Sequence, residues 1–188
     1  GTSSGDFISF ESSSFSGNNL IKALGGNDTI DGGDGADNLT GGVGDDVYLF
    51  DTGDVDSGEV ITENPGEGTD VVAIVTSTDF SLITAASLDE IEEIRFAGAS
   101  QTGTFTGSQL TGETINLTET AAGTSNLIID VGSGTTATFA NMTASTFSSG
   151  ADTVTINGST GNENITGPNL VSTILGGVGV DTLVAGTA

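Results

Sequence analysis

Acidic and amide side chains recur at a fixed interval near the start of the chain, each inside a glycine-rich segment. Asn19, Asp28, Asp37 and Asp46 are nine residues apart, and a glycine stands two positions before each of them. Calcium takes about six to eight oxygen ligands from carboxylates, amides and backbone carbonyls, so these residues have the chemistry of a calcium site. Glycines lose much freedom on ordering and neighbouring carboxylates repel, and a bound cation would offset both costs. The spacing therefore predicts calcium ions held among glycine-rich turns.

The elements that position these residues follow from the rest of the nine-residue pattern. Four units begin at residues 14, 23, 32 and 41, and they read SFSGNNLIK, ALGGNDTID, GGDGADNLT and GGVGDDVYL. The eighth residue of every unit is apolar: Ile21, Ile30, Leu39 and Tyr48. Each unit therefore predicts a turn of about six residues followed by a very short strand with one inward side chain.

Stacking of these units would bring the acidic positions together. Two units complete one coil of a flattened solenoid, so turns two units apart lie one strand spacing (~4.8 Å) apart. This arrangement places Asp28 beside Asp46 and Asn19 beside Asp37. Glycine lets each turn bend through positive φ and direct its carbonyl groups inward, where a cation between stacked turns could be bound.

The units resemble the nonapeptide of the repeats-in-toxin (RTX) family, GGxGxDxUx, in which U is a large apolar residue. The resemblance is closest over residues 32–50 and implies a calcium-loaded parallel β-roll. ITENPGEGTDVV, residues 61–72, is similar to the segment that commonly follows such repeats, which makes Glu63 and Asp70 further candidates. The candidate calcium ligands of this roll, counting side chains and turn glycines, are Asn19, Gly26, Asp28, Asp34, Gly35, Asp37, Gly44, Asp45, Asp46, Glu63, Gly66, Gly68 and Asp70.

The repeat returns in a degenerate form near the C-terminus. Units beginning at residues 147, 158, 167 and 176 read FSSGADTVT, GSTGNENIT, GPNLVSTIL and GGVGVDTLV, and the eighth residue is apolar in each. The candidate ligands are Asp152, Glu163, Gly179 and Asp181, and Glu163 is expected beside Asp181. Counting ligands predicts about one or two calcium ions here, against about two to four in the first roll.

These patterns predict an all-β fold with a parallel β-roll at both ends flanking a β-rich middle segment. The expected parts are an N-terminal strand (1–13), an N-terminal roll with a hairpin (14–74), a β-rich middle region (75–146) and a degenerate C-terminal roll (147–188).

Two parts of the chain do not follow the repeat. The polar residues around 54–58 predict a hairpin that joins strands Val47–Phe50 and Glu59–Thr62. Residues 87–96, SLDEIEEIRF, fit either an amphipathic helix or a short helical turn leading into a strand, with the acidic side chains solvated. Short β-prone runs separated by Gly, Ser, Thr and Asn turns are expected at Val71–Thr76, Ile91–Phe96, Thr114–Leu117, Asn126–Val131 and Thr135–Phe139.

Composition excludes several classes of chemistry and partner. The 26 acidic residues against two basic ones give a formal net charge of −24, which disfavours nucleic acid and anionic membranes. With no cysteine and no histidine, disulfides, thiolate chemistry, imidazole triads and typical zinc sites are excluded. No apolar run is long enough to insert in a membrane as a spanning helix.

The sequence favours a non-enzymatic role. No pair of carboxylates stands out from the 26 as an acid and base, and the clustered ones already have a calcium explanation. The RTX resemblance implies a bacterial protein that is secreted by a type I route and folds on meeting calcium outside the cell. Its location would then be extracellular or on the cell surface, although LVAGTA is not a recognisable version of the family's C-terminal export signal.

The expected partners are copies of the chain itself. Neither end shows an obvious cap for its strand edges, so the C-terminal roll of one molecule could stack on the N-terminal roll of the next in a head-to-tail homopolymer. The expected product is an extracellular filament, a biofilm matrix or a surface layer (S-layer). The alternatives are a calcium-dependent adhesin or binding module, with a surface glycan or another matrix component as partner, and a C-terminal repeat fragment of a secreted RTX enzyme or toxin.

Overall fold

The structure, a computed structural model, describes residues 1–9, 17–147 and 151–186. Its strands form four sheets in which every neighbouring pair is parallel. We name these sheets A to D. A chain that always pairs in parallel must cross over between strands, and here it does so by winding in coils. The described part of the chain is thus an all-β parallel solenoid, as the nine-residue period predicts.

Each sheet takes its strands from successive coils, so the spatial order of the strands follows the order of the chain. Sheet A contains β1 (Phe7–Ser9), β3 (Thr29–Asp31), β5 (Val47–Phe50), β7 (Val71–Ile74), β9 (Glu93–Phe96), β11 (Asn116–Glu119) and β14 (Thr143–Ala144). Sheet B contains β2 (Leu20–Gly25), β4 (Asn38–Val43) and β6 (Val60–Thr62). Sheet C contains β8 (Thr78–Asp79), β10 (Thr102–Thr106), β12 (Asn126–Asp130), β15 (Thr153–Asn157) and β17 (Thr173–Leu175), and sheet D contains β13 (Thr136–Thr138), β16 (Asn164–Thr166) and β18 (Thr182–Val184).

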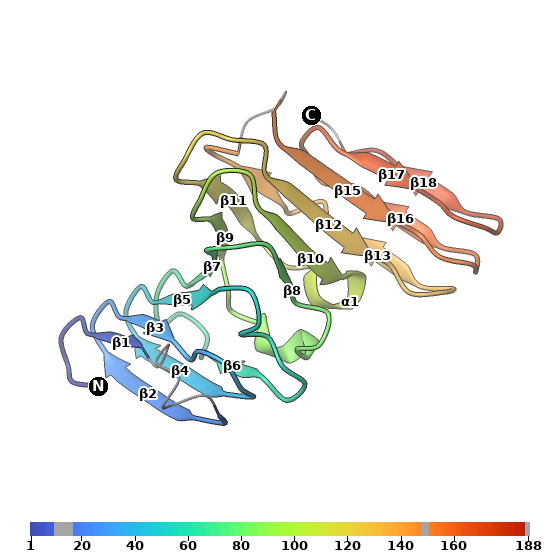
Figure 1. Cartoon of the computed structure of the whole chain (residues 1–188). Coiled ribbons are helices and arrows are strands. Elements are labelled where there is room, and N and C mark those ends of the chain that lie inside the picture. Colours follow the sequence, from blue (N-terminus) through green and yellow to red (C-terminus); the bar gives the residue numbers. More distant parts are fainter. Residues whose placement is uncertain (10–16, 148–150, 187–188) are drawn as a thin grey trace.

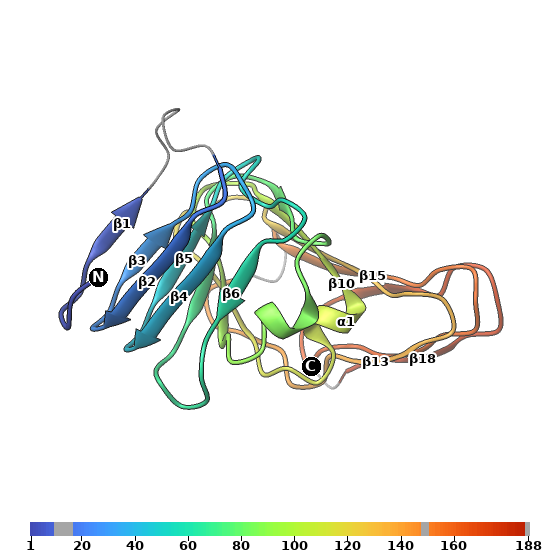
Figure 2. The same ribbon diagram turned by 90° about the horizontal axis from the view of Figure 1, so that it is seen from below.

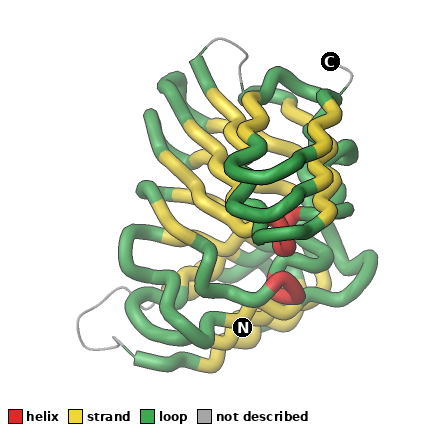
Figure 3. The backbone as a smooth tube through the Cα atoms, turned by 90° about the vertical axis from the view of Figure 1, so that its right-hand side faces the viewer, coloured by secondary structure: helices red, strands yellow, loops and turns green. Residues whose placement is uncertain are grey.

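The coils change their pair of faces along the molecule. The first coils alternate between sheets A and B and the next between A and C. Two coils, β11 to β13 and β14 to β16, then have one strand in each of sheets A, C and D, and the last coil lies between C and D. Between sheets B and D the solenoid has two helical turns, η1 (Ala85–Ser87) and α1 (Gly107–Leu110), which lie against each other. Figure 1 shows the N-terminal and C-terminal coils at opposite ends of the molecule, and Figure 3 shows the coils stacked on one another. The middle region is therefore a continuation of the solenoid.

Coil length varies along the molecule. Stacked residues are 18 apart between Asp28 and Asp46, and again between Glu163 and Asp181, as two nonapeptides require. The separation is 22 in the first coil, from Asp6 to Asp28, and it reaches 27 at Asp152. Figure 2 shows the strands of the first roll lying side by side, with longer connections farther along the chain.

The core is a set of columns of inward side chains. Ile30, Tyr48, Val72, Ile94 and Leu117 occupy matching positions of five successive strands of sheet A, and each is fully buried. Side chains alternate along a strand, and in β9 and β11 the intervening residues are polar and partly exposed, whereas in β7 both faces are buried. The apolar eighth positions Ile21, Ile30, Leu39 and Tyr48 are all buried, as predicted.

Aromatic rings fill the wider middle coils. The rings of Phe80 and Phe105 are stacked with centroids 4.6 Å apart, and Phe50 meets Phe80 edge-on at 5.2 Å. The short helix α1 is closed by a capping box between Thr106 and Gln109. The Gln109 amide also donates to the carbonyl oxygens of Phe80 and Ile83. These contacts hold α1 against the segment that follows β8, beyond the last strand of sheet B.

The predicted hairpin is wrong. β5 lies in sheet A, whereas β6 lies in sheet B and pairs in parallel with β4. The polar residues between them carry the chain from one sheet to the other, which lets Ile61 enter the core with 2% of its surface exposed. Of the two possibilities for residues 87–96, the structure has the short helical turn followed by a strand, η1 and then β9. The N-terminal strand is found as β1, and residues 10–13 of that predicted segment lie outside the described residues.

Candidate metal centre

Carboxylates that precede the strands of sheet A are linked through backbone amides into a column, which we call the sheet A ladder. The N–H of each member donates to a carboxylate oxygen of the next coil: Asp6 to Asp28 (2.6 Å), Asp28 to Asp46 (2.7 Å), Asp46 to Asp70 (2.9 Å) and Asp70 to Glu92 (2.7 Å). A carboxylate that accepts a backbone N–H has one oxygen fixed in place, so the second oxygen is also oriented.

A shorter column, the sheet B ladder, precedes the strands of sheet B. The N–H of Asn19 donates to Asp37 Oδ1 at 2.7 Å, and the N–H of Asp37 donates to Glu59 Oε2 at 2.7 Å. The two ladders lie at the turns that the nonapeptides form. The predicted neighbours Asn19 and Asp37 therefore meet, as do Asp28 and Asp46 in the other ladder.

The second oxygens of three ladder aspartates are buried without a hydrogen-bond partner among the described residues. These atoms are Oδ2 of Asp28, Asp37 and Asp46. A buried polar atom left without a partner costs about 1–3 kcal/mol, and more when it carries charge. The backbone passes so close to two of them, at Gly32 and Gly41, that a Cβ there would overlap the oxygen. Oxygen atoms oriented in this way fit a hard cation such as calcium.

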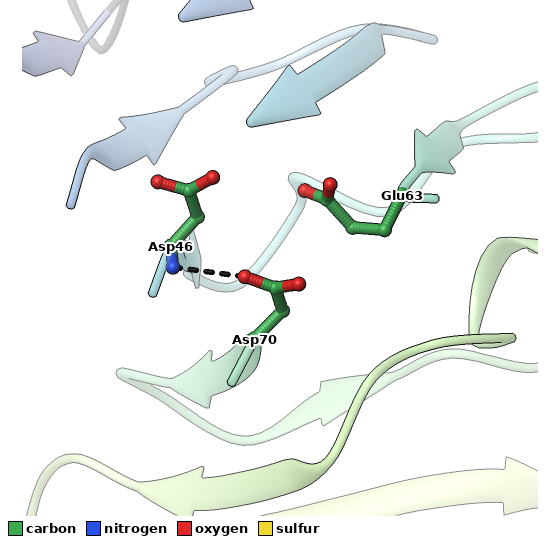
Figure 4. A group of neighbouring side chains, drawn as sticks. All are labelled: Asp46, Glu63 and Asp70. Atoms are coloured by element: carbon green, nitrogen blue, oxygen red, sulfur yellow. Dashed lines mark hydrogen bonds between the residues drawn. The ribbon is translucent and has the colours of Figure 1, made fainter. Parts of the chain in front are cut away.

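Three carboxylates gather at one point of the first roll. Oxygens of Asp46, Glu63 and Asp70 all lie within 4.8 Å of one another, and Asp46 and Asp70 are buried (Figure 4). Asp46 precedes β5, Asp70 precedes β7, and Glu63 follows β6 on the other sheet. This three-carboxylate cluster therefore joins sheets A and B, and it offers up to six oxygens to one ion.

A buried tyrosine holds Glu63 in the cluster. The Tyr48 hydroxyl donates to Glu63 Oε1 and accepts the N–H of Gly41 at 2.6 Å. The N–H groups of Gly41 and Gly42 also donate to Glu63, at 3.2 and 3.4 Å. Tyr48 was expected only as a core residue, so its part in orienting a carboxylate was not predicted.

Burial raises the pKa values of these acids. It raises the pKa of Asp70 to about 7 and that of Glu59 to about 8, and neighbouring carboxylates (Glu63 and Asp46 for Asp70, Asp37 for Glu59) add to the effect. Burial also raises the pKa of Asp46 and Glu63. Without a cation Asp70 and Glu59 retain protons close to neutral pH, and a bound cation would replace those protons.

Other candidate residues lie in the turns but outside the ladders. Asp34 and Asp45 are exposed, and Asp45 accepts the N–H of Thr69 at 2.9 Å. Turn glycines stack between coils: Gly44 has a φ of 139° and packs against the Gly26 carbonyl, and Gly68 packs against Gly44. Gly35 and Gly66 also have positive φ, which favours glycine at these turns.

The second roll has a sparser arrangement. The N–H of Glu163 donates to Asp181 at 3.0 Å, so the predicted neighbours meet. Asp152 instead precedes a strand of sheet C and accepts the N–H of Ser125 at 2.8 Å. Glu163 accepts the N–H groups of Gly134 and Ser159, and the Gly134 bond is the main cause that lowers its pKa. Gly179, with a φ of 153°, packs its turn against the Gly161 carbonyl.

Three ladder members were missed from the sequence: Asp6, Glu59 and Glu92. Each is 22 residues from its ladder partner, so a search at the spacing of two nonapeptides does not find it. The signal available was an acid immediately before a short β-prone run.

Stacked carboxylates over glycine-rich turns in a parallel solenoid define a calcium-binding β-roll. Residues 13–48 match the family model of the RTX calcium-binding nonapeptide repeat, in four copies. No curated protein and no solved structure matches the chain. The chain thus carries RTX repeats, which bind calcium, and several copies of the repeat imply several ions. Among the described residues, no helix is long and apolar enough to cross a membrane.

Proposed function

We propose that the chain is a secreted, non-catalytic structural protein that folds on binding calcium and assembles head to tail into an extracellular filament, matrix or surface layer. The proposal rests on the edge strands and exposed apolar side chains at the two ends of the solenoid. Within the described residues, each end has edge strands and exposed apolar side chains next to a calcium-binding type of repeat, although the N-terminal amino group donates to the Lys22 carbonyl of β2 at 2.9 Å and so covers part of that edge.

The C-terminal end is the more apolar of the two. Val171, Val178 and Val180 are 69%, 71% and 80% exposed, and Leu183 is 45% exposed although it aligns with the fully buried Ile165. The last described coil thus exposes, on its open face, apolar residues of the type that point inward in the earlier coils. β17 and β18 are the edge strands here, and their open backbone groups could pair with another parallel strand.

The N-terminal end has the same type of coil. β1 and β2 are its edge strands, and Phe7 and Leu20 are 71% and 67% exposed. Both ends have a two-sheet coil whose edge strands run parallel to their neighbours, so the last coil of one molecule could continue into the first coil of the next. Because the two surfaces differ, such a contact repeats without closing and produces a filament or a lattice.

Calcium would control this assembly through folding. The ladder carboxylates are close together and three of their oxygens are buried without a hydrogen-bond partner, so without calcium the roll must either bury charge or hold protons there. Calcium binding would remove that cost and order the glycine-rich turns. In the proposed role, the chain remains unassembled where calcium is scarce and assembles where it is abundant.

The test is negative-stain electron microscopy and circular dichroism of one sample, first in excess chelator and then in millimolar calcium. We expect β-structure and ordered filaments or sheets to appear together only with calcium. Single particles that fold with calcium at high protein concentration would refute the assembly, whereas full folding in chelator would refute the calcium control.

One observation favours a binding module as the second candidate. A depression of about 370 Å³ beside α1 is lined mainly by hydroxyl-bearing and small residues, including Thr106, Ser108, Thr135 and Asp130. Hydroxyl and carboxylate groups could hydrogen-bond a surface glycan. Calcium-dependent retention of the monomeric protein on a glycan array, together with no assembly, would favour this function.

A further inference from the structure

A second group of buried oxygens without hydrogen-bond partners lies outside the nonapeptide turns. In the part of the chain that the structure describes, six buried side-chain atoms lack such a partner, and three of them are the Oδ2 atoms of the ladder aspartates. The other three are Gln101 Oε1, Glu119 Oε2 and Ser125 Oγ. All three lie where the coils pass from sheet A to sheet C, a place that we call the A–C corner.

Backbone register brings these residues together. Gln101, Ser125 and Asp152 each precede a strand of sheet C, and those strands pair in register as Thr102 with Asn126 and Asn126 with Thr153. The three residues are therefore stacked in successive coils, one strand spacing (~4.8 Å) apart. All three are buried, with exposures of 5%, 0% and 8%, so their side chains point into the solenoid.

Glu119 faces this column from the other sheet. Glu119 is the last residue of β11, in the same coil as Ser125. Because side chains alternate along a strand, it faces the same side as Leu117, which lies two residues earlier and is buried. Its carboxyl group interacts with that of Asp152; burial, followed by that neighbouring charge, raises the pKa of Glu119. Two carboxyl groups this close require a proton or a cation between them.

The hydrogen bonds present fix the backbone around the free oxygens. Ser125 N–H donates to Asp152 Oδ1 at 2.8 Å, which holds Ser125 next to that carboxylate. The Gln101 amide nitrogen donates to the Val75 carbonyl at 2.9 Å, so its carbonyl oxygen is the atom left unpaired inside. Neither basic side chain of the protein enters the corner, because Lys22 is exposed on sheet B and Arg95 pairs with Glu93 at 2.7 Å.

We propose that the A–C corner is a calcium site, with the carboxylates of Glu119 and Asp152, the Ser125 hydroxyl and the Gln101 carbonyl oxygen as its ligands. The site lies outside the RTX match and takes only Asp152 from a nonapeptide. Its ion would tie sheet A to sheet C in the middle coils, so calcium would stabilise the part of the solenoid that has no regular repeat. The proposal does not depend on head-to-tail assembly.

Ion counting by native mass spectrometry of the full chain, over a series of free calcium concentrations, tests the proposal. We expect Glu119→Gln to bind one calcium ion fewer than the unaltered protein at saturation. The matched control is Glu113→Gln, because Glu113 is also partly buried with a raised pKa but lies near Asp89 and Glu90, away from the corner. The control should keep the full count. Equal saturating counts for both variants and the unaltered protein would overturn the proposal, and the corner would then be a pair of carboxyls sharing a proton.

A second variant covers the case in which Glu119→Gln does not fold. Ser125→Ala removes only a buried hydroxyl without a hydrogen-bond partner, and we expect the last ion to require roughly 10-fold more free calcium, the scale on which loss of one supporting contact weakens a metal site. If the hydroxyl has no ligand role, its removal leaves the calcium series unchanged, and that result contradicts the proposal.

Discussion

The two rolls share the 18-residue coil but differ in how their carboxylates are arranged. The sheet A ladder runs through five acids in succession, three of them in the first roll, and a second ladder runs beside it on sheet B. In the described part of the second roll Glu163 and Asp181 make a single step, and Asp152 belongs to a different sheet. The same coil can thus be built with dense or sparse charge, so coil geometry alone does not determine how strongly calcium controls folding.

Removing a central acid from each roll should give the largest difference. Asp46 belongs to both the sheet A ladder and the three-carboxylate cluster, so Asp46→Ala should cost roughly 3–5 kcal/mol in calcium, the range for deleting one partner of a buried charged group. Asp181→Ala loses one backbone hydrogen bond and should cost about 1 kcal/mol. Urea unfolding at fixed free calcium measures both. Equal costs would mean that the rolls depend on their carboxylates to the same degree.

The tyrosine contact should have an intermediate effect. Tyr48→Phe keeps the buried ring but leaves Glu63 and the Gly41 N–H without the hydroxyl, which should cost about 1–3 kcal/mol. The loss should be greater in calcium than in chelator, because Glu63 would be less well oriented for the ion. Calcium titrations followed by circular dichroism check this, and an equal loss in both conditions would limit Tyr48 to packing.

A change of pH should affect the stability of the two rolls in opposite directions. Asp70 and Glu59 have folded-state pKa values of about 7 and about 8, above those of the unfolded chain, so in chelator the folded state binds the extra protons. Their contribution to stability is therefore present at low pH and is lost as the pH rises through 7 to 8. Glu163 has a lowered pKa, so its contribution is present above its ordinary value and is lost on acidification.

Calcium should reverse the pH trend of the first roll. Because the ion replaces protons on Asp70 and Glu59, the stability gained on adding calcium should increase between pH 5 and 8. Thermal unfolding across this range, with and without calcium, measures the gain. A gain that does not change with pH would show that these acids do not exchange protons for the ion.

The exposed end should show the smallest change in stability. Leu183 and Ile165 occupy matching positions of neighbouring strands, but Ile165 is fully buried. Leu183→Ala should therefore change the free energy of unfolding by less than about 0.5 kcal/mol, whereas Ile165→Ala should cost about 2–5 kcal/mol. Urea unfolding compares them, and a large cost for Leu183→Ala would show that something covers the last coil.

The sequence predicts the rolls well where the period is regular. A nine-residue period places an apolar residue at the eighth position and an acid or amide at the sixth position of each unit, so the inward Ile30 and Leu39 and the meeting of Asp28 with Asp46 could be predicted. The hairpin prediction failed because a polar turn between β-prone runs looks the same whether the second run pairs with the first or crosses to the opposite sheet. The parallel register of β6 depends on contacts with β4 that local sequence does not encode.

The middle coils could be predicted only as strands. Their length follows the loops between sheets, which differ from coil to coil, so no period reveals that residue 92 lies under residue 70. The oxygens of the A–C corner were missed for the same reason, since Gln101, Glu119 and Ser125 form no motif: the register of sheet C stacks Gln101 and Ser125, and Glu119 comes from sheet A. Tertiary pairing, rather than residue type, brings them together.

The hydrogen bonds of the ladders have a direction in sequence. Each carboxylate accepts the amide of the preceding coil, so the amide of Asp28 is satisfied by Asp46 and that of Asp46 by Asp70. The ladder amide of each of these coils is therefore satisfied only by the coil that follows it in sequence. A roll cut short after any of them would leave the ladder amide of its last coil unpaired, so each coil is completed by the next one.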